Sequence, residues 1–530
     1  MNLKRNCLAI ITLTCSALVV TSCQDRNSFN LYHNIAEVSD THEEFVADDG
    51  SFKKPGDFKT YKALSGTTEV ELGTTYETLT EYTGRNILKA EGDRKLLVVP
   101  VQFSDFTISS LGISPDEYIT NLNKAFFGTS RNNKYVSVAE YYNRSSYGKL
   151  RISGKVCDQF FTYPNTVAEI TQNKSKYTRN RVLECYNKVL SWYQDTYHES
   201  LDEYRINPED ENSDVAIYLV YTYPIDWNKQ DSQFFWAFTF QDKPLSWSSY
   251  SFINTISGYP DAHTYIHETG HLLGLVDYYP NEENESTTSV YEPAGRIDMM
   301  DCSVGDHTGL SKMMLNWARP YWVTGQNWDA NGVESCEITI RSLADSGDLI
   351  LINDLWNETV FDEYYLIEFY TPTGLNYFDT SIGNNLAKLP TLPGIKIYHV
   401  DARLGYYNVE NNTKTFSRYY CDEEVKAGVE PYVPKKGNID IVHDNTTYSK
   451  AEDTDFHLKN YLYELIFNNA DDITTTTSSC ATNKNLFRKG DVFEDLKFNS
   501  SKLWTQDYKI TVTRMTYRDA TIKIEKVKEI

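Results

Sequence analysis

The run His-Glu-Thr-Gly-His-Leu-Leu-Gly-Leu-Val-Asp at residues 267–277 is the most informative stretch of this chain. Residues four apart share one face of a helix, so His267 and His271 can direct their imidazoles at one metal ion while Glu268 reaches water beside it. Apolar neighbours give such a helix a face to bury, and Asp261 is a suitable N-cap. We therefore expect a metal-binding helix that starts just before this run.

A glycine three residues after the second histidine predicts how the chain leaves this helix. Gly274 adopts a left-handed backbone without steric cost, so a sharp turn can bring Asp277 back under the metal. Two imidazoles and one carboxylate leave a fourth position for water, which is typical of a catalytic zinc site. The pattern predicts Zn²⁺ held by His267, His271 and Asp277. It further predicts peptide hydrolysis with Glu268 as the general base.

A second short motif follows about twenty residues later, in the turn-rich run Asp298-Met299-Met300-Asp301. A methionine pair by itself more often packs in a core. Its position after the extended metal motif instead favours a place in the floor of the site.

Residues close to Asp277 leave two alternatives open. Tyr278 and Tyr279 follow it directly, and either could assist an oxyanion or simply pack. The acidic run Glu282, Glu283 and Glu285, together with Asp306, could bind Ca²⁺, although a solvated loop has the same composition. No role is predicted for His263, His307 or His399.

The N-terminus resembles an export signal. Lys4 and Arg5 precede an apolar run from Leu8 to Val20, which is too short to span a bilayer comfortably. The run ends in Val-Thr-Ser-Cys at residues 20–23, which resembles the lipobox of bacterial lipoproteins. We expect Cys23 to carry a lipid that anchors the chain to the membrane at the cell surface, with secretion after a conventional cleavage as the alternative.

The charge and cysteine content of the chain limit the kinds of molecule that we expect it to bind. The formal net charge is -23, from 51 basic and 74 acidic residues, so phosphate backbones are repelled and nucleic acid is not an expected partner. The 9 cysteines include no C-x-x-C pair, which argues against a cysteine zinc site. Expected partners are protein or peptide substrates, and the membrane through the lipid.

Hydrophobic patterning predicts four segments. Residues 1–22 form the signal and 23–93 a polar tether or pro-segment. From 94 to 325 apolar runs and helical patterns alternate, beginning with a buried strand at 95–103, which indicates an α/β or α+β catalytic domain. Within it we expect helices at 115–127, 138–147 and 167–194, and strands at 150–156, 215–223, 234–240 and 249–256. From 326 to 530 a period of two dominates, which predicts an all-β, sandwich-like region.

Beyond these patterns the chain resembles the immune inhibitor A family of bacterial metallopeptidases, a metzincin-like group whose zinc motif ends in Asp. The resemblance rests on the zinc motif and on segments at 97–106, 137–156, 298–300, 305–307, 311–317 and 394–401. It implies a metzincin-like catalytic domain, a zinc endopeptidase activity on proteins, His267, His271 and Asp277 as ligands, Glu268 as base and Met300 in the methionine turn.

Two other functions are compatible with the same residues. One is a non-catalytic, metal-containing surface protein that binds host protein or glycan, although such a protein has no need of Glu268. The other is a zinc hydrolase of non-peptide bonds, which the chemistry of the ion also allows.

Overall fold

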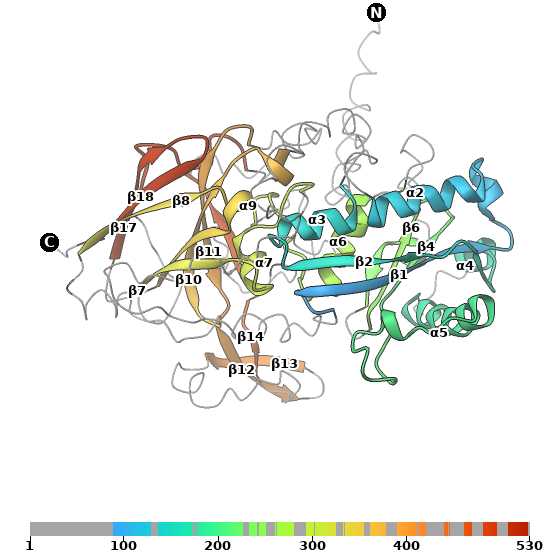
Figure 1. The fold of residues 1–530 in the computed structure, drawn as a ribbon. Coiled ribbons are helices and arrows are strands. Elements are labelled where there is room, and N and C mark those ends of the chain that lie inside the picture. Colours follow the sequence, from blue (N-terminus) through green and yellow to red (C-terminus); the bar gives the residue numbers. More distant parts are fainter. Residues whose placement is uncertain are drawn as a thin grey trace, which may run out of the picture.

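The structure is a computed structural model. It describes residues 88–128, 136–172, 178–225, 233–240, 243–250, 260, 262–279, 293–301, 303–324, 332, 334–353, 361–377, 390–410, 413–419, 439–443, 445, 461–468, 481–494 and 507–527. The signal at 1–22, the lipid site Cys23, nearly all of the predicted tether, the N-cap Asp261 and the acidic residues Glu282, Glu283 and Glu285 lie outside the described residues. Figure 1 shows an α/β part beside a β-rich part.

The N-terminal part is built on one mixed sheet with the strand order β2-β1-β4-β6-β5, and β3 extends the pairing of β1. Its strands are β1 (Gly92–Phe103), β2 (Leu150–Val156), β3 (Phe161–Tyr163), β4 (Ile217–Tyr221), β5 (Phe238–Thr239) and β6 (Leu245–Ser249). All pairs are parallel except β5 with β6. The antiparallel strand β5 therefore ends this sheet.

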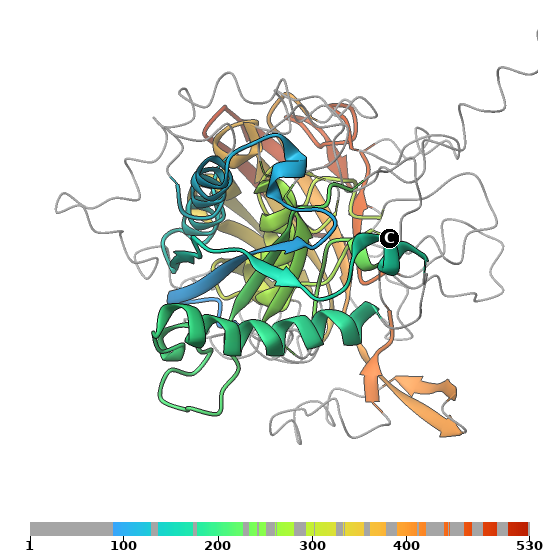
Figure 2. The same cartoon turned by 90° about the vertical axis from the view of Figure 1, so that its right-hand side faces the viewer.

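Helices cover both faces of this sheet, as its strand pattern requires. Alternate residues of β1 point to opposite sides, so Leu96 and Val98 join one core and Leu97 and Val99 another. The helices are α2 (Pro115–Phe127), α3 (Val138–Ser145) and α6 (Ala262–Leu272) on the first side, and α4 (Val167–Gln172) and α5 (Thr178–Tyr197) on the second. Figure 2 shows α5 along the face opposite to α2.

The β-rich part contains three more sheets. The first has the order β15 (Tyr463–Ile466), β11 (Gly394–Asp401), β10 (Glu363–Tyr370), β9 (Asp348–Asn353) and β7 (Arg319–Thr324). The second has β16 (Val492–Phe493), β17 (Asp507–Met515), β18 (Asp519–Val527) and β8 (Ser335–Arg341). The third, β13 (Thr413–Tyr419), β12 (Leu404–Glu410) and β14 (Ile439–Ile441), projects from the rest in both views (Figures 1 and 2).

The five-stranded sheet is buried on both faces, and this joins the two parts. Ile350 and Ile352 of β9 face the four-stranded sheet and share a core with residues such as Ile338. Their neighbours Leu349 and Leu351 belong to the same core as the first face of the N-terminal sheet. The C-terminal region is thus β-rich with two sheets packed on each other, and its inner sheet completes the core of the α/β part.

The sequence-based expectations hold for most elements near the site. The strand expected at 95–103 is confirmed, and so are the strands or helices predicted near 115–127, 138–147 and 150–156. One long helix predicted at 167–194 is instead the pair α4 and α5. The strand expected at 249–256 falls almost entirely outside the described residues. Strand β6 was not predicted, because its buried serines interrupt the apolar pattern that would have revealed it.

Two details qualify the predicted β-rich region. The short helices α7 (Gly309–Met314) and α9 (Leu343–Ser346) flank its first strands, and β7 pairs in parallel with β9. Strand β7 ends at Thr324, so the predicted division at residue 325 falls after a strand that already belongs to the second part. In the described part of the chain, no helix is long and apolar enough to cross a membrane.

We predict that Leu351→Ala destabilises the whole chain, because this side chain is fully buried between the two parts. The free energy of unfolding is expected to fall by about 2–5 kcal/mol. Chemical denaturation followed by both fluorescence and circular dichroism measures the change, with the exposed substitution Glu337→Gln as the control. Two separate transitions, of which only one shifts, would contradict a shared core.

Candidate metal centre

Helix α6 carries the first two predicted ligands and the predicted base. His267, Glu268 and His271 are all nearly buried, with 7%, 5% and 7% of their surface exposed. Tyr265 anchors the helix to the sheet, because its hydroxyl donates to the carbonyl of Ser249 at the end of β6 (3.0 Å). The helix therefore presents its polar face from a fixed position.

The third predicted ligand returns to the two histidines. One carboxylate oxygen of Asp277 lies 3.1 Å from Nε2 of His267 and 3.1 Å from Nε2 of His271. The three ligating atoms all lie within 4.8 Å of one another. Among the described residues, no other group of three or more His, Cys, Asp or Glu side chains is close enough together to hold a metal ion. The three residues that the sequence singled out as ligands thus converge.

Gly274 makes this return possible. Its φ of 102° lies in the left-handed region, where a side chain would be strained. Its N–H donates to the carbonyl of His271 (3.0 Å), and the N–H of Leu275 donates to the carbonyl of Gly270 (3.0 Å). These bonds close the helix end as expected and reverse the chain toward Asp277.

Backbone carbonyls orient both imidazoles. Nδ1 of His267 lies 2.8 Å from the carbonyl oxygen of Met299, and Nδ1 of His271 lies 2.8 Å from that of Leu275. A carbonyl only accepts, so Nδ1 of each ring donates in these contacts, and Nε2 of each ring faces Asp277. This arrangement fits a metal ion, because ligating histidines commonly donate their other N–H to such an acceptor.

Burial and the two histidines have opposite effects on the pKa values of Asp277 and Glu268. Burial by itself would raise the pKa of Asp277, but His271 and His267 hold that pKa well below its usual range, so this carboxylate is ionised. Burial raises the pKa of Glu268, and the same histidines offset only part of the rise. Two neighbouring carboxylates with different proton affinities result, as separate roles for ligand and base require.

Thr239 is a contact that the sequence did not predict. It lies on β5, and its hydroxyl is 2.8 Å from Oε2 of Glu268 and 2.9 Å from the carbonyl oxygen of the same residue. Ser246 of β6 is a further neighbour of that hydroxyl (2.8 Å). Only the pairing of β5 with β6 brings Thr239 to the helix, so no local pattern could have revealed it.

The predicted methionine turn lies against α6. A Cβ added to Gly270 would come within 2.4 Å of the sulfur of Met300, so the thioether packs directly on the helix between the two histidines. The carbonyl of Met300 accepts a hydrogen bond from Tyr278 N–H (2.8 Å), next to Asp277. The turn therefore contacts both the helix and the returning chain.

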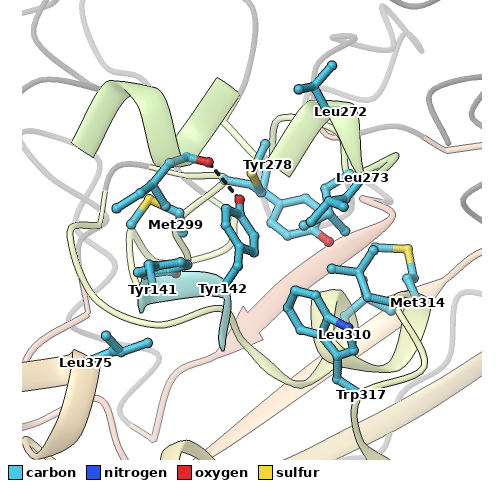
Figure 3. Close-up of a cluster of buried hydrophobic side chains, with 14 of the residues drawn as sticks. Tyr141, Tyr142, Leu272, Leu273, Tyr278, Met299, Leu310, Met314, Trp317 and Leu375 are labelled. Carbon is cyan, nitrogen blue, oxygen red and sulfur yellow. Dashed lines mark hydrogen bonds between the residues drawn. The ribbon is translucent and has the colours of Figure 1, made fainter. Parts of the chain in front are cut away.

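The apolar cluster beneath these residues supports α6 from the side of α3 (Figure 3). Tyr142 of α3 donates its hydroxyl proton to the carbonyl of Ile266 (2.7 Å), one residue before the first ligand. Leu272 and Leu273, at the end of the helix, are fully buried in the same core. The helix that carries the two histidines therefore packs on a buried apolar core.

The other residues considered from the sequence have different surroundings. The hydroxyl of Tyr278 meets Ser311 (3.0 Å) in a buried contact, whereas the ring of Tyr279 lies 6.4 Å from that of His267. Nε2 of His263 is 2.9 Å from the carbonyl oxygen of Ser303. Asp306 pairs with Lys312 (2.8 Å), and His399 pairs with Glu363 (2.9 Å) in the β-rich part.

No family model matches this chain, and no curated protein is significantly similar to it in sequence. The geometry of the site and the motif within it are therefore the basis for inferring a function.

We predict that Gly270→Ala destabilises the site, because the new methyl group collides with Met300. The expected loss is about 1–3 kcal/mol of unfolding free energy, as for other overpacked positions. The same substitution in a Met300→Ala background should cost less, since the colliding sulfur is absent. Thermal denaturation of the two single variants and the double variant measures the coupling, and purely additive losses would contradict the contact.

Proposed function

We propose that this protein is a zinc-dependent endopeptidase. The observation that carries the proposal is the convergence of His267, His271 and Asp277, with the carboxylate of Glu268 held beside them by Thr239. The resemblance of the zinc motif and its surrounding segments to the immune inhibitor A metallopeptidases supports the same activity. On this proposal the α/β part is a metzincin-like catalytic domain, and Met300 belongs to its methionine turn.

The residues divide the chemistry between them. Zn²⁺ held by His267, His271 and Asp277 would supply a Lewis acid for the scissile carbonyl and would lower the pKa of water to about 7. Glu268 would accept a proton from the attacking water and pass it to the leaving amine, for which a buried carboxylate with a raised pKa is suited. Asp277 remains ionised and contributes its charge to the ligand set. The apolar core beneath α6 keeps bulk water away from that side of the site.

The position of β5 supports a peptide chain as the substrate rather than a non-peptide ester or amide. Among the described residues β5 pairs only with β6, so its outer edge can pair with an extended chain by strand addition. Thr239 of this strand touches Glu268, so a peptide added there would pass the base. Trp236, which precedes the strand and is 48% exposed, offers an apolar contact for substrate side chains.

The N-terminal sequence indicates where in or on the cell the enzyme acts. We propose that Cys23 is lipidated after export and tethers the enzyme to the cell surface. The polar segment that follows Cys23 would then separate the catalytic part from the membrane.

We predict that the full-length protein cleaves denatured casein or gelatin and that a zinc chelator stops the cleavage. Glu268→Ala should lower kcat by at least about 10²–10⁴-fold, because the proton acceptor is lost, while the ligands still bind zinc. Gel-based digestion and metal analysis on the same preparations measure both properties, with Glu337→Gln as a control on a distant exposed residue.

The outcomes of this experiment separate the competing functions. A protein that binds zinc but digests no protein substrate would favour a binding role or a non-peptide substrate. A Glu268→Ala variant that remains fully active would remove this residue from the mechanism.

We also predict a role for the hydroxyl of Thr239. Thr239→Val removes the 2.8 Å contact to Glu268 with little change in side-chain volume, so kcat should fall by about tenfold, near the value of one hydrogen bond to a charged group, while KM changes little. Thr239→Ser retains the hydroxyl and should restore kcat. Equal activity of the valine and serine variants would rule out this contribution.

A further inference from the structure

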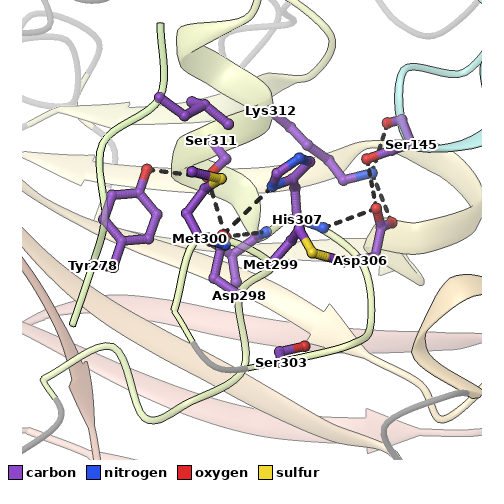
Figure 4. A network of polar contacts seen from close by, with 12 residues as sticks. Ser145, Tyr278, Asp298, Met299, Met300, Ser303, Asp306, His307, Ser311 and Lys312 are labelled. Carbon is purple, nitrogen blue, oxygen red and sulfur yellow. Dashed lines mark hydrogen bonds and ion pairs between the residues drawn. The ribbon is translucent and has the colours of Figure 1, made fainter. Parts of the chain in front are cut away.

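The carboxylate of Asp298 is the centre of a buried polar cluster beside the candidate metal centre (Figure 4). Its Oδ1 accepts from Met300 N–H (2.7 Å), and its Oδ2 accepts from Thr308 N–H (2.7 Å) and from the hydroxyls of Thr308 (2.6 Å) and Ser311 (3.1 Å). Nδ1 of His307 lies 3.5 Å from Oδ1. Burial alone would raise the pKa of Asp298, but these partners hold it at about 2. The residue is therefore a buried, ionised carboxylate surrounded by donors.

The turn that begins at Asp298 contacts one candidate ligand and the residue next to another. The carbonyl of Met299 accepts from Nδ1 of His267 (2.8 Å), and the carbonyl of Met300 accepts from the N–H that follows Asp277 in the chain (2.8 Å). A shift of this turn would therefore rotate one imidazole and displace the third ligand together. The carboxylate of Asp298 opposes such a shift because it bonds both the turn and the segment at 308–311.

The same cluster connects to the β-rich part. Tyr463 of β15 donates its hydroxyl proton to the hydroxyl of Thr308 (2.7 Å), which in turn donates to Asp298. Asn445 donates its side-chain amide to the carbonyl of Tyr278 (3.2 Å) and to that of Tyr463 (2.8 Å). The inner sheet of the β-rich part thus supports both the turn and the chain that carries the third ligand.

We propose that Asp298 is a positioning residue that sets the geometry of the zinc ligands through the carbonyls of Met299 and Met300, and that Thr308 and Tyr463 extend this support to the β-rich part. The inference rests on the proposed zinc site. It assigns to Asp298 an effect on metal affinity that is separate from its contribution to the stability of the fold.

The test compares Asp298→Asn with the wild-type full chain. Asparagine has nearly the same shape but replaces one acceptor oxygen with an NH₂ group that faces donors, so the turn should shift. Zinc affinity, measured by competition with a chromogenic chelator, should fall about 10- to 100-fold, as for other outer-sphere partners of metal ligands. Thermal denaturation of the metal-free proteins gives the change in fold stability separately.

Three further variants keep the test informative. Asp348→Asn alters another buried carboxylate, which holds Arg341 in the β-rich part, and should leave zinc affinity unchanged even where it lowers stability. Thr308→Val removes one donor to Asp298 without changing its charge. It should reduce zinc affinity by less than Asp298→Asn, whereas Thr308→Ser should match wild type. If Asp298→Asn does not fold, this threonine pair decides the question.

The outcomes are distinguishable. Weaker zinc binding by Asp298→Asn and Thr308→Val, with normal binding by Asp348→Asn and Thr308→Ser, supports the inference. Wild-type affinity in both Asp298→Asn and Thr308→Val overturns it while leaving the proposed enzyme intact. A wild-type chain that binds no zinc overturns the inference and the proposed function together.

Discussion

Three ligating atoms can hold one ion only if they remain close together, and here the third atom comes from outside the helix that carries the first two. His267 and His271 are one turn apart on α6, so the helix itself sets their spacing. Asp277 depends on the turn at Gly274 and on the contact of the following residue with Met300. The buried packing of the turn at 298–301 against α6 is the interaction on which the candidate site depends.

That packing requires material from both parts of the molecule. The core under α6 continues into the inner face of the five-stranded sheet, where Leu349 and Leu351 are fully buried. Glu368 of β10 accepts from Gly309 N–H (2.6 Å) at the start of α7, and Lys312 of α7 bonds the carbonyl of Ser145 at the end of α3 (2.7 Å). These contacts tie α3, α7 and β10 into one body. The β-rich part therefore forms a structural component of the site rather than a separate attachment.

Local sequence rules account for the parts of the fold that depend on near neighbours. The continuous apolar run of β1 indicated a strand buried on two faces, and the period of two beyond residue 326 indicated packed sheets. The same rules failed at β6, where serines are buried, and at α4 and α5, where one helical period covers two helices. At β6 the deciding property was tertiary burial, which a window of sequence does not contain.

The candidate site divides in the same way. The sequence by itself determined the identity and spacing of His267, Glu268 and His271 and the sharp turn that follows, because helical periodicity and the conformational freedom of glycine are local properties. Only the tertiary structure brought Thr239 to Glu268 and placed Asp298 at the centre of its cluster. Those contacts join residues on separate elements, and their formation depends on strand order and on the packing of one sheet between two layers.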